Sequence, residues 1–279
     1  MSSQSRLRRL FSPKSVAVIG GGVWCRSVIE QLFKIGYKGK IFPVHPSKKE
    51  ILGLKYFKDL EEVPIEIDAS FVGVNRNITI EVIKKLNELN AGGAVCFASG
   101  FLEAEDDKQG SGELQNSLIE AAGDMPILGP NCYGFINYLD CSVLWPDQHG
   151  GKAVDRGVAI LTQSSNLAIN ITMQTRGLPI SYIMSVGNQA SLGFPEIGMY
   201  LLSDPRVTAL GLHIEGIGEV RAFEELATKA RKLGKSIVVL KVGKSAEARK
   251  AAQSHTASLA GNAQGAKSLF KRLGIAEVD

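Results

Sequence analysis

Short runs of β-branched and other apolar residues alternate with segments of helical periodicity along almost the whole chain of 279 residues. This alternation is typical of parallel sheets whose strands are joined by crossover helices. Strands are predicted near residues 15–20, 40–44, 68–74, 92–98, 126–128, 157–162, 180–185, 207–214 and 236–241. Helices are predicted near residues 25–35, 78–90, 112–123, 166–176, 193–203, 219–232 and 263–273. The sequence therefore predicts an α/β fold with parallel sheets.

The alternation pauses once, in the turn-rich stretch from Asn137 to Gly157. We place a domain boundary inside this stretch, which divides the chain into domains at 1–145 and 146–279. A chain of this length, with 44% hydrophobic residues, can give each of two domains its own core.

Composition excludes several classes of protein. The apolar runs have the length of strands, and the basic N-terminus lacks the apolar region of a secretory signal, so we expect no membrane association. The four cysteines do not form a metal-binding pattern, so no metal site is expected and a reducing cytoplasm is the default location. A net charge of +4, with both signs interspersed, argues against nucleic acid as a partner.

Glycine and polar clusters follow the predicted strands. The segments GGG, HPSKK, NRN, SGF and GPNCYG follow the first five strands, and QSSN, GNQ, EG and QSHTASLAG follow the next four. Open α/β sheets bind ligands beyond the carboxyl ends of their strands. These nine loops therefore predict a ligand site along one edge.

The glycine turn after the first strand suits a phosphate, because backbone N–H groups and a helix N-terminus can approach one there. It is not a complete GxGxxG motif. The second strand ends in FPVHPSKK, where an NAD-binding unit would carry an acidic residue. The histidine and lysines favour a ligand with an additional phosphate, such as NADP or coenzyme A; solvated surface lysines are the alternative.

The runs VAVIGGG, IFPVHPSKKEILG, GPNCYG and SHTASLAGNAQG together resemble the NDP-forming acyl-CoA synthetases, the superfamily of the succinyl-CoA synthetase α subunits. The similarity extends over nearly the whole chain from about Leu10. It implies a Rossmann-like CoA-binding domain followed by a flavodoxin-like ligase domain of the succinyl-CoA synthetase type.

The resemblance also implies which loops contact coenzyme A. The glycine turn would hold phosphates, the loop after the second strand would receive the nucleotide end, and the loops after the fourth and fifth strands would lie beside the pantetheine and the thioester. The matching residues are Gly20, Gly21, Gly22, Val44, Pro46, Lys48, Ser99, Gly100 and Asn131.

By the same resemblance, His255 would become the phosphohistidine and Glu215 would orient it. Ser164, Ser165 and Asn166 match the start of a helix that faces the phosphate. A neutral imidazole is a nucleophile near pH 7, and a carboxylate on one ring nitrogen leaves the other nitrogen able to attack phosphorus.

The implied reaction converts a small carboxylic acid, CoA and ATP to acyl-CoA, ADP and phosphate. No stretch of the sequence resembles the ATP-grasp domain that would supply ATP and Mg²⁺, so we expect a partner subunit or a longer parent chain, in an oligomer. The alternatives are a non-catalytic CoA-sensing module of a larger protein, such as a protein acetyltransferase, and an NADP oxidoreductase.

The chain departs from the family pattern at Trp24, Arg26, Arg76 and Ala257, and two of these residues have two interpretations each. Trp24, directly after the glycine turn, either alters the phosphate contacts or caps the core. Arg76, in the GVNRN turn, is either a specific contact or a surface charge.

Overall fold

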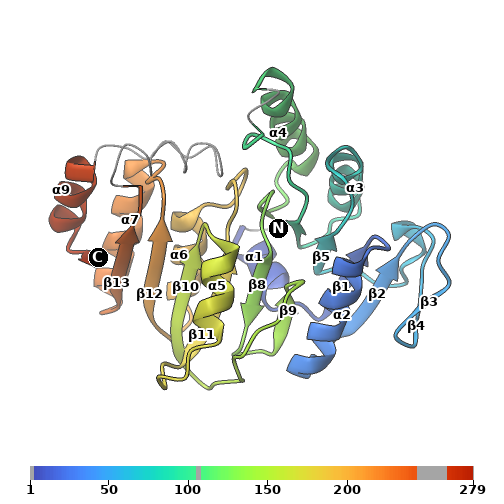
Figure 1. The fold of residues 1–279 in the computed structure, drawn as a ribbon, viewed down its shortest axis with the longest axis horizontal. Helices are drawn as coiled ribbons and strands as arrows, with labels where there is room; N and C mark the ends of the chain where they lie inside the picture. The colour runs from blue at the N-terminus through green and yellow to red at the C-terminus, as the bar shows by residue number, and fades with distance from the viewer. Residues whose placement is uncertain (1–2, 105–107, 244–262, 279) are drawn as a thin grey trace.

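The computed structural model describes residues 3–104, 108–243 and 263–278, and its strands form two large sheets that lie side by side (Figure 1). The first sheet is parallel and has the order β2-β1-β5-β6-β7. Its strands are β1 (Ser15–Ile19), β2 (Lys40–Val44), β5 (Ala69–Val72), β6 (Gly93–Cys96) and β7 (Ile127–Leu128). This order reverses at β1, as expected of a doubly wound fold.

The second sheet has the order β14-β13-β12-β10-β11-β8-β9. Its strands are β8 (Gly134–Asn137), β9 (Ser142–Leu144), β10 (Gly157–Thr162), β11 (Ile180–Ser185), β12 (Val207–Ile214), β13 (Ser236–Lys241) and β14 (Ala276–Val278). A separate two-stranded ribbon, β3 (Glu50–Ile51) and β4 (Leu54–Lys55), follows β2 and precedes the 3₁₀ turn η1 (Leu60–Glu62).

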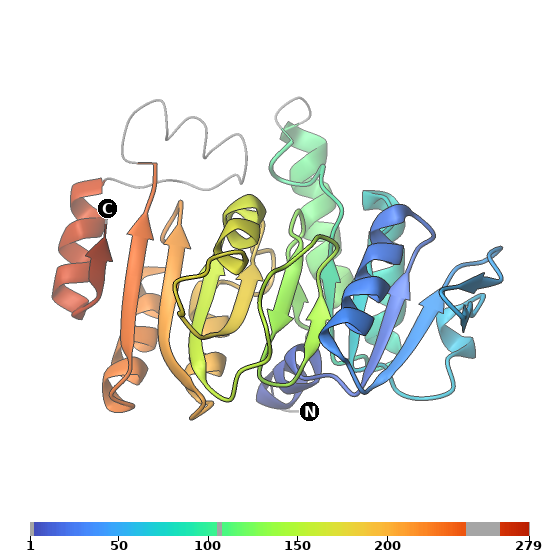
Figure 2. The same ribbon diagram turned by 60° about the horizontal axis from the view of Figure 1, so that its bottom comes forward.

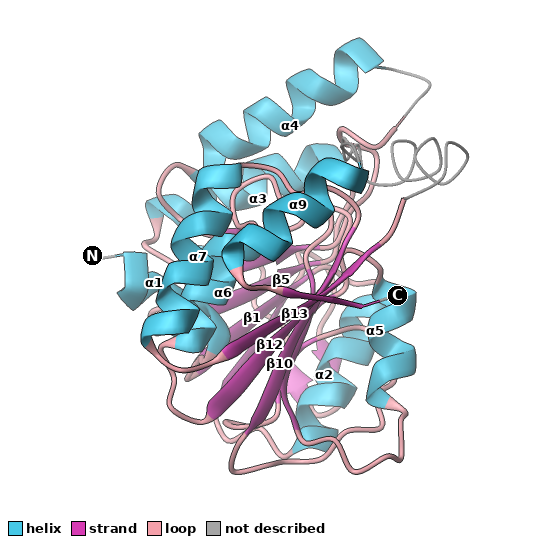
Figure 3. Ribbon diagram, turned by 90° about the vertical axis from the view of Figure 1, so that its left-hand side faces the viewer, coloured by secondary structure: helices cyan, strands magenta, loops and turns pink. Residues whose placement is uncertain are grey.

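Helices cover both faces of the sheets: Figure 3 shows α2 and α5 on one side of the strands and α1, α6 and α7 on the other. The helices are α1 (Ser3–Phe11), α2 (Val23–Ile35), α3 (Arg76–Glu88), α4 (Lys108–Ala122), α5 (Ser165–Thr172), α6 (Phe194–Leu202), α7 (Val220–Lys232) and α9 (Ala263–Leu273). The parallel strands can therefore be buried on both faces, as all five residues of β1 are.

Short polar residues fix where helices begin. The Asn75 side chain accepts hydrogen bonds from the backbone N–H groups of Asn77 and Ile78, both at 3.1 Å, and so caps α3. Gly36 ends α2 with a φ of 79°, a left-handed conformation that glycine adopts without strain. Local sequence signals therefore fix the start of α3 and the end of α2.

The second sheet is not wholly parallel, which differs from the prediction. Strands β8 and β9 form a hairpin that pairs antiparallel with β11 through β8, with Ile183 opposite Ile136. This hairpin lies within the stretch assigned to the first domain, yet its backbone hydrogen bonds are made with the second sheet. The residues of β8 and β9 are fully buried, and each strand is too short to show an alternation of apolar and polar residues. Their sequence pattern therefore does not predict strands.

The two halves of the chain share one apolar core. A single cluster contains Val28 and Leu32 of α2, Leu144 of β9, and Phe194 and Leu210 from the second half. A second cluster lies between the first sheet and helices α3 and α4. Burial across the junction therefore stabilises both halves together.

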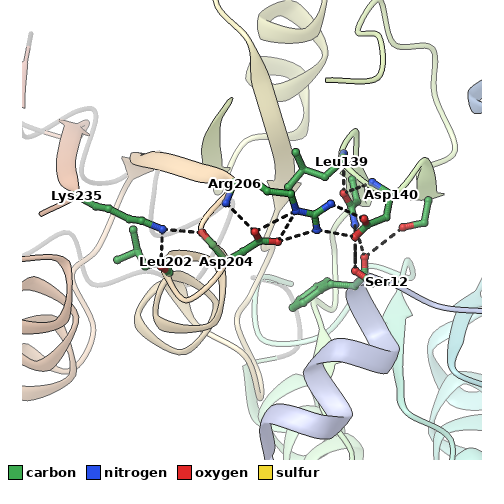
Figure 4. A network of polar contacts seen from close by, with 10 residues as sticks. Ser12, Leu139, Asp140, Leu202, Asp204, Arg206 and Lys235 are labelled. Atoms are coloured by element: carbon green, nitrogen blue, oxygen red, sulfur yellow. Dashed lines mark hydrogen bonds and ion pairs between the residues drawn. The ribbon is translucent and has the colours of Figure 1, made fainter. Parts of the chain in front are cut away.

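A polar network joins the two halves of the chain at their junction (Figure 4). Asp140, in the β8–β9 turn, accepts hydrogen bonds from Ser12 at 2.8 Å, from Asn137 at 3.0 Å and from Arg206 at 2.8 Å. Arg206 also binds Asp204 just before β12. The network joins the end of α1 to the second sheet.

Among the helices of the described residues, none combines the length and apolarity needed to cross a bilayer.

Candidate functional site

The loops that follow the parallel strands gather along one edge of the molecule. In Figure 2 the arrows of the blue strands β1 and β2 and of the orange strands β12 and β13 point toward the same edge. Because α/β sheets bind ligands at this edge, the placement agrees with the prediction from the glycine and polar clusters.

The glycine turn after β1 is built by close packing. Gly20 has a φ of +125°, and a Cβ placed on it would lie 2.7 Å from the carbonyl oxygen of Gly73 and 2.9 Å from Sγ of Cys25. Its N–H donates to the carbonyl of Val44 at 3.0 Å. Only glycine can occupy this position, because β1 and β5 approach each other so closely where they end.

His45 and Lys48 cover the second glycine of the turn. A Cβ on Gly21 would lie 2.6 Å from the imidazole of His45 and 2.8 Å from Cε of Lys48. The ammonium group of Lys48 donates to the carbonyl of Gly21. His45 Nδ1 accepts hydrogen bonds from the backbone N–H groups of Ser47 and Lys48, both at 3.3 Å. A cation is thus positioned at the turn, as a phosphate site requires.

The remaining predicted residues of these two loops differ in exposure. Gly22 is the exposed N-cap of α2, and a Cβ there would meet nothing within 4 Å, which leaves room for a phosphate at the helix N-terminus. Pro46 is exposed. Val44 is only 5% exposed and its side chain belongs to the core. Its backbone carbonyl contributes to the loop by accepting the hydrogen bond from Gly20.

A cavity of about 530 Å³ lies where the two halves of the chain meet. Its lining includes the predicted residues Ser99 and Asn131 from the first half and Ser165 from the second. The lining residues are Trp24, Gly73, Val74, Asn75, Arg76, Phe97, Ala98, Ser99, Asn131, Cys132, Tyr133 and Ser165. Three predicted residues therefore share one space.

Arg76 makes a specific contact with Gly100, which is the first of the two interpretations given for this residue. It is the first residue of α3, and its Nη1 donates to the carbonyl of Gly100 at 2.6 Å. The Gly100 N–H donates to Glu103 Oε1 at 2.6 Å. Gly100, with a φ of +92°, is thus held from both sides by side chains.

The GPNCYG loop meets the second half through amide and carboxylate groups. Asn131, with a left-handed φ of 57°, donates its backbone N–H to Ala98 at 2.9 Å and its side-chain amide to Asn188 at 3.4 Å. The Asn188 amide donates in turn to the carboxylate of Glu103. This chain of contacts fixes the wall of the cavity that contains Asn131.

Helix α5 begins at the cavity. The Ser164 hydroxyl accepts a hydrogen bond from the backbone N–H of Leu167 at 3.2 Å and so caps the helix. The Ser165 hydroxyl lies 2.8 Å from that of Ser185 on β11, while Asn166 is exposed. The N–H groups of the first helical turn and the positive end of the helix dipole favour an anion here.

Glu215 is supported by buried polar residues on both sides. Its N–H donates to Oε1 of Gln163 at 2.6 Å, and its carbonyl accepts from Nζ of Lys241 at 2.6 Å. Gln163 and Lys241 are 5% and 3% exposed. Gln163 begins the QSSN cluster of the predicted ligand edge, although no role at Glu215 was predicted for it, and it also lines a second cavity of about 560 Å³ with Gly216.

His255 lies outside the described residues, so its relation to Glu215 and to α5 stays a prediction. The described histidines each have structural partners. His213 Nδ1 lies 3.0 Å from the Thr162 hydroxyl. His149 is 3% exposed, and burial, together with the charge of Lys34, lowers its pKa to about 4.

Three cysteine thiols lie close to the site loops and are buried. Burial raises the pKa of Cys25 to about 11 and that of Cys96 to about 12, and it raises the pKa of Cys132 well above its ordinary value. These thiols are therefore protonated near neutral pH. The part of the chain that the structure describes contains no cluster of residues suited to hold a metal ion.

Each half of the chain matches the model of a known protein family. Residues 14–138 match a CoA binding domain, and residues 155–279 match a succinyl-CoA ligase like flavodoxin domain.

Curated relatives agree over almost the whole chain. The α subunit of an ADP-forming acetate–CoA ligase II from Pyrococcus furiosus is 33% identical over 95% of this chain and 58% of its own length. A trans-feruloyl-CoA synthase from an unknown prokaryotic organism is 31% identical over 99% of this chain and 40% of its own length. The chain thus spans about two fifths to three fifths of the length of these relatives.

A solved structure has the same arrangement of both halves. The acetyl-coenzyme A synthetase 1 of Ca. Korarchaeum cryptofilum, in complex with phosphate and ADP, superposes with a TM-score of 0.86 at 30% identity, over 98% of this chain and 59% of that one. Together with the two domain matches and the relatives, this places the chain in the NDP-forming acyl-CoA synthetase superfamily, of which it carries the CoA-binding domain and the succinyl-CoA ligase-like flavodoxin domain.

Proposed function

We propose that this chain is the CoA-binding and phosphohistidine part of an ADP-forming acyl-CoA synthetase. The observation that supports this most is the shared cavity, because Ser99 and Asn131 of the CoA-binding half and Ser165 at the start of α5 line the same space. A thiol carried by the first half and a phosphate held by the second half can meet there.

The reaction balances in three transfers. First, a nitrogen of His255 takes the γ-phosphoryl group of ATP and ADP leaves. Second, an oxygen of the carboxylate substrate takes that phosphoryl group and the imidazole leaves, which forms an acyl phosphate. Third, the CoA sulfur attacks the acyl carbon, the thiol proton is lost and inorganic phosphate leaves. Helix α5 and its cap Ser164 would hold the phosphoryl oxygens through backbone N–H groups, and Glu215 would orient the imidazole.

The nucleotide and Mg²⁺ would come from an ATP-grasp subunit or domain, in an oligomer with this chain. Relatives named as acetate–CoA ligase α subunits support a partner of this kind. The acids named for the relatives range from acetate to 4-hydroxybutyrate and ferulate.

The decisive experiment is labelling with ATP that carries ³²P in its γ-phosphoryl group, in the presence of the ATP-grasp partner. We expect an acid-labile, base-stable label on the chain, because phosphohistidine has this stability. His255→Asn should lose the label and all acyl-CoA synthesis while CoA affinity stays unchanged. The control His45→Asn should keep the label. A label that persists in His255→Asn contradicts the mechanism, and a chain that binds CoA but takes no label is a CoA-sensing module.

A further inference from the structure

The second cavity, of about 560 Å³, lies where helices α6 and α7 begin. Gly193 and Glu196 line it from the start of α6, and Gly216 and Glu219 line it from the loop between β12 and α7. Leu102, from the first half of the chain, lines it as well. We call this space the α6–α7 cavity. Its volume lies within the range of pockets that hold a ligand or an inserted side chain.

The α6–α7 cavity is separate from the cavity of about 530 Å³ proposed for CoA. Within the described chain the two have no lining residue in common. Helix α5, whose first residue Ser165 lines the proposed CoA cavity, covers one face of the second sheet, whereas α6 and α7 cover the other (Figure 3). Trp24 lines the CoA cavity and is 42% exposed; it does not cap the core, so that interpretation of the sequence is wrong.

Charge disfavours an anion in the α6–α7 cavity. Glu196 and Glu219 are the only charged residues that line it in the described part of the chain, and both are exposed. The first N–H groups of α6, which could bind an anion, are already engaged. That of Gly193 donates to Glu196 at 3.1 Å, and that of Phe194 donates to Gln189 at 3.1 Å. The occupant is therefore a cation or carries one.

A buried amide calls for a hydrogen-bond acceptor in the same space. Gln163 is 5% exposed and lines the cavity. Its Oε1 accepts from the N–H groups of Glu215 at 2.6 Å and Gly216 at 3.4 Å, which fixes the orientation of the amide. Its NH₂ group has no acceptor among the described residues. Since a buried donor without a partner costs free energy, the occupant should present an acceptor to Gln163.

A polypeptide segment with a basic side chain meets both requirements. Its guanidinium or ammonium group can pair with Glu196 and Glu219, and its backbone carbonyl can accept from the Gln163 amide. Leu102 and Val220, which are 45% and 46% exposed beside these groups, give the segment apolar surface to cover. A free small cation would neutralise the carboxylates but leave the amide and this apolar surface without a partner.

The position of the cavity indicates which polypeptide binds there. Gly216 lines it and directly follows Glu215, the residue proposed to orient His255. The ATP-grasp subunit or domain has to bring the γ-phosphoryl group of ATP to this part of the chain. We infer that the ATP-grasp partner docks here, with a basic side chain in the α6–α7 cavity between Glu196 and Glu219. This inference rests on the proposed function.

The test is titration calorimetry of the full-length chain with the ATP-grasp partner used for labelling, at low and at high salt. Glu196→Gln and Glu219→Gln should each weaken partner binding by about threefold, since each removes one charge of a partly exposed pair. The double variant should lose about tenfold and should depend less on salt. Glu196→Gln keeps an oxygen that can accept from the Gly193 N–H, so the cap of α6 is retained.

Glu225→Gln is the matched control, because Glu225 is an exposed glutamate of α7 outside the cavity. It should leave both the affinity and its salt dependence unchanged. With saturating partner, Glu219→Gln should be phosphorylated at the wild-type rate, since Glu219 contributes to docking and not to the chemistry.

The negative results have different meanings. Wild-type affinity and salt dependence in the double variant, or a slower phosphorylation of Glu219→Gln at saturation, would overturn the inference and leave the proposed function intact. A wild-type chain that binds CoA but no ATP-grasp partner at any salt concentration would contradict the proposed function as well.

Discussion

Lys48 shows how a single residue can prepare a phosphate site. Its ammonium group is held by the Gly21 carbonyl, directly over the turn in which glycine leaves room for a ligand. A phosphate arriving there gains a charge-assisted contact with a side chain that is already in place.

Replacing Lys48 by Ala should weaken CoA binding by about 1–3 kcal/mol, as expected for loss of a charge-assisted hydrogen bond. Dephospho-CoA, which lacks the 3′-phosphate, should bind the wild-type chain as weakly as CoA binds the variant. Calorimetry measures both, and Lys49→Ala, at the adjacent exposed position, is the control. Equal wild-type affinities for CoA and dephospho-CoA would refute this role of Lys48.

Glu215 should orient the imidazole of His255 through its charge. Glu215→Gln preserves the shape of the side chain, and Gln163 and Lys241 still hold its backbone. We expect phosphorylation by the partner to slow by about tenfold or more while CoA affinity holds. Single-turnover labelling measures this rate. Glu219→Gln, at an exposed glutamate of the following loop, is the control, and an unchanged rate in Glu215→Gln would remove Glu215 from the mechanism.

At the scale of elements, Asp140 in the β8–β9 turn is a carboxylate that connects several elements at the junction. Burial by itself would raise the pKa of Asp140, but hydrogen bonds from Arg206, Asn137 and Ser12 outweigh it and lower the pKa below its ordinary value. The contribution of Asp140 to stability is therefore complete above its unfolded pKa, about 3.9, and is lost as the pH falls through the lower folded pKa.

Asp140→Asn should consequently lower the free energy of unfolding at pH 7 by about 1 kcal/mol. The value is modest because the Arg206 and Asp140 side chains are 41% and 32% exposed and solvent screens their attraction. Below pH 4 the difference between variant and wild type should shrink. Urea unfolding at pH 7, 5 and 3 measures it, with the exposed Asp124→Asn as control. A difference that does not depend on pH would show that the charge of Asp140 is not responsible.

The elements also show what the sequence could predict. All nine predicted strands form, because each is a short apolar run bounded by turn residues. Helix α1, the ribbon β3–β4 and the hairpin β8–β9 were not predicted. At the site, the roles of Arg76 and Gln163 depend on partners 24 and 52 residues away in the chain, Gly100 and Glu215. Local pattern cannot reveal such contacts, because they exist only once the strands are assembled.

At the scale of the whole molecule, the two family domains do not correspond to two separate cores. The hairpin β8–β9 comes before the predicted boundary but pairs with β11, and helix α2 packs in the same apolar cluster as Phe194 and Leu210. Opening the junction exposes apolar surface of both halves.

We therefore expect the full-length chain to unfold in one calorimetric transition. A fragment of residues 1–145 should melt more than roughly 10 °C lower, because it loses the β8–β11 pairing and part of the shared core. Co-expression with a fragment of residues 146–279 should restore most of the loss and serves as the control. Two resolved transitions in the intact chain would show that the halves unfold independently.

The buried thiols have a chemical consequence for a protein that would handle activated acyl groups. With pKa values of about 11 and about 12, Cys25 and Cys96 are protonated at pH 7, and burial also raises the pKa of Cys132 well above its ordinary value. A mixed anhydride formed beside these three side chains would meet protonated thiols, which are weak nucleophiles, so their acylation by the intermediate is slow. For the same reason a colorimetric thiol reagent should consume CoA well before it reaches these three side chains, which makes release or uptake of CoA measurable in the presence of the protein.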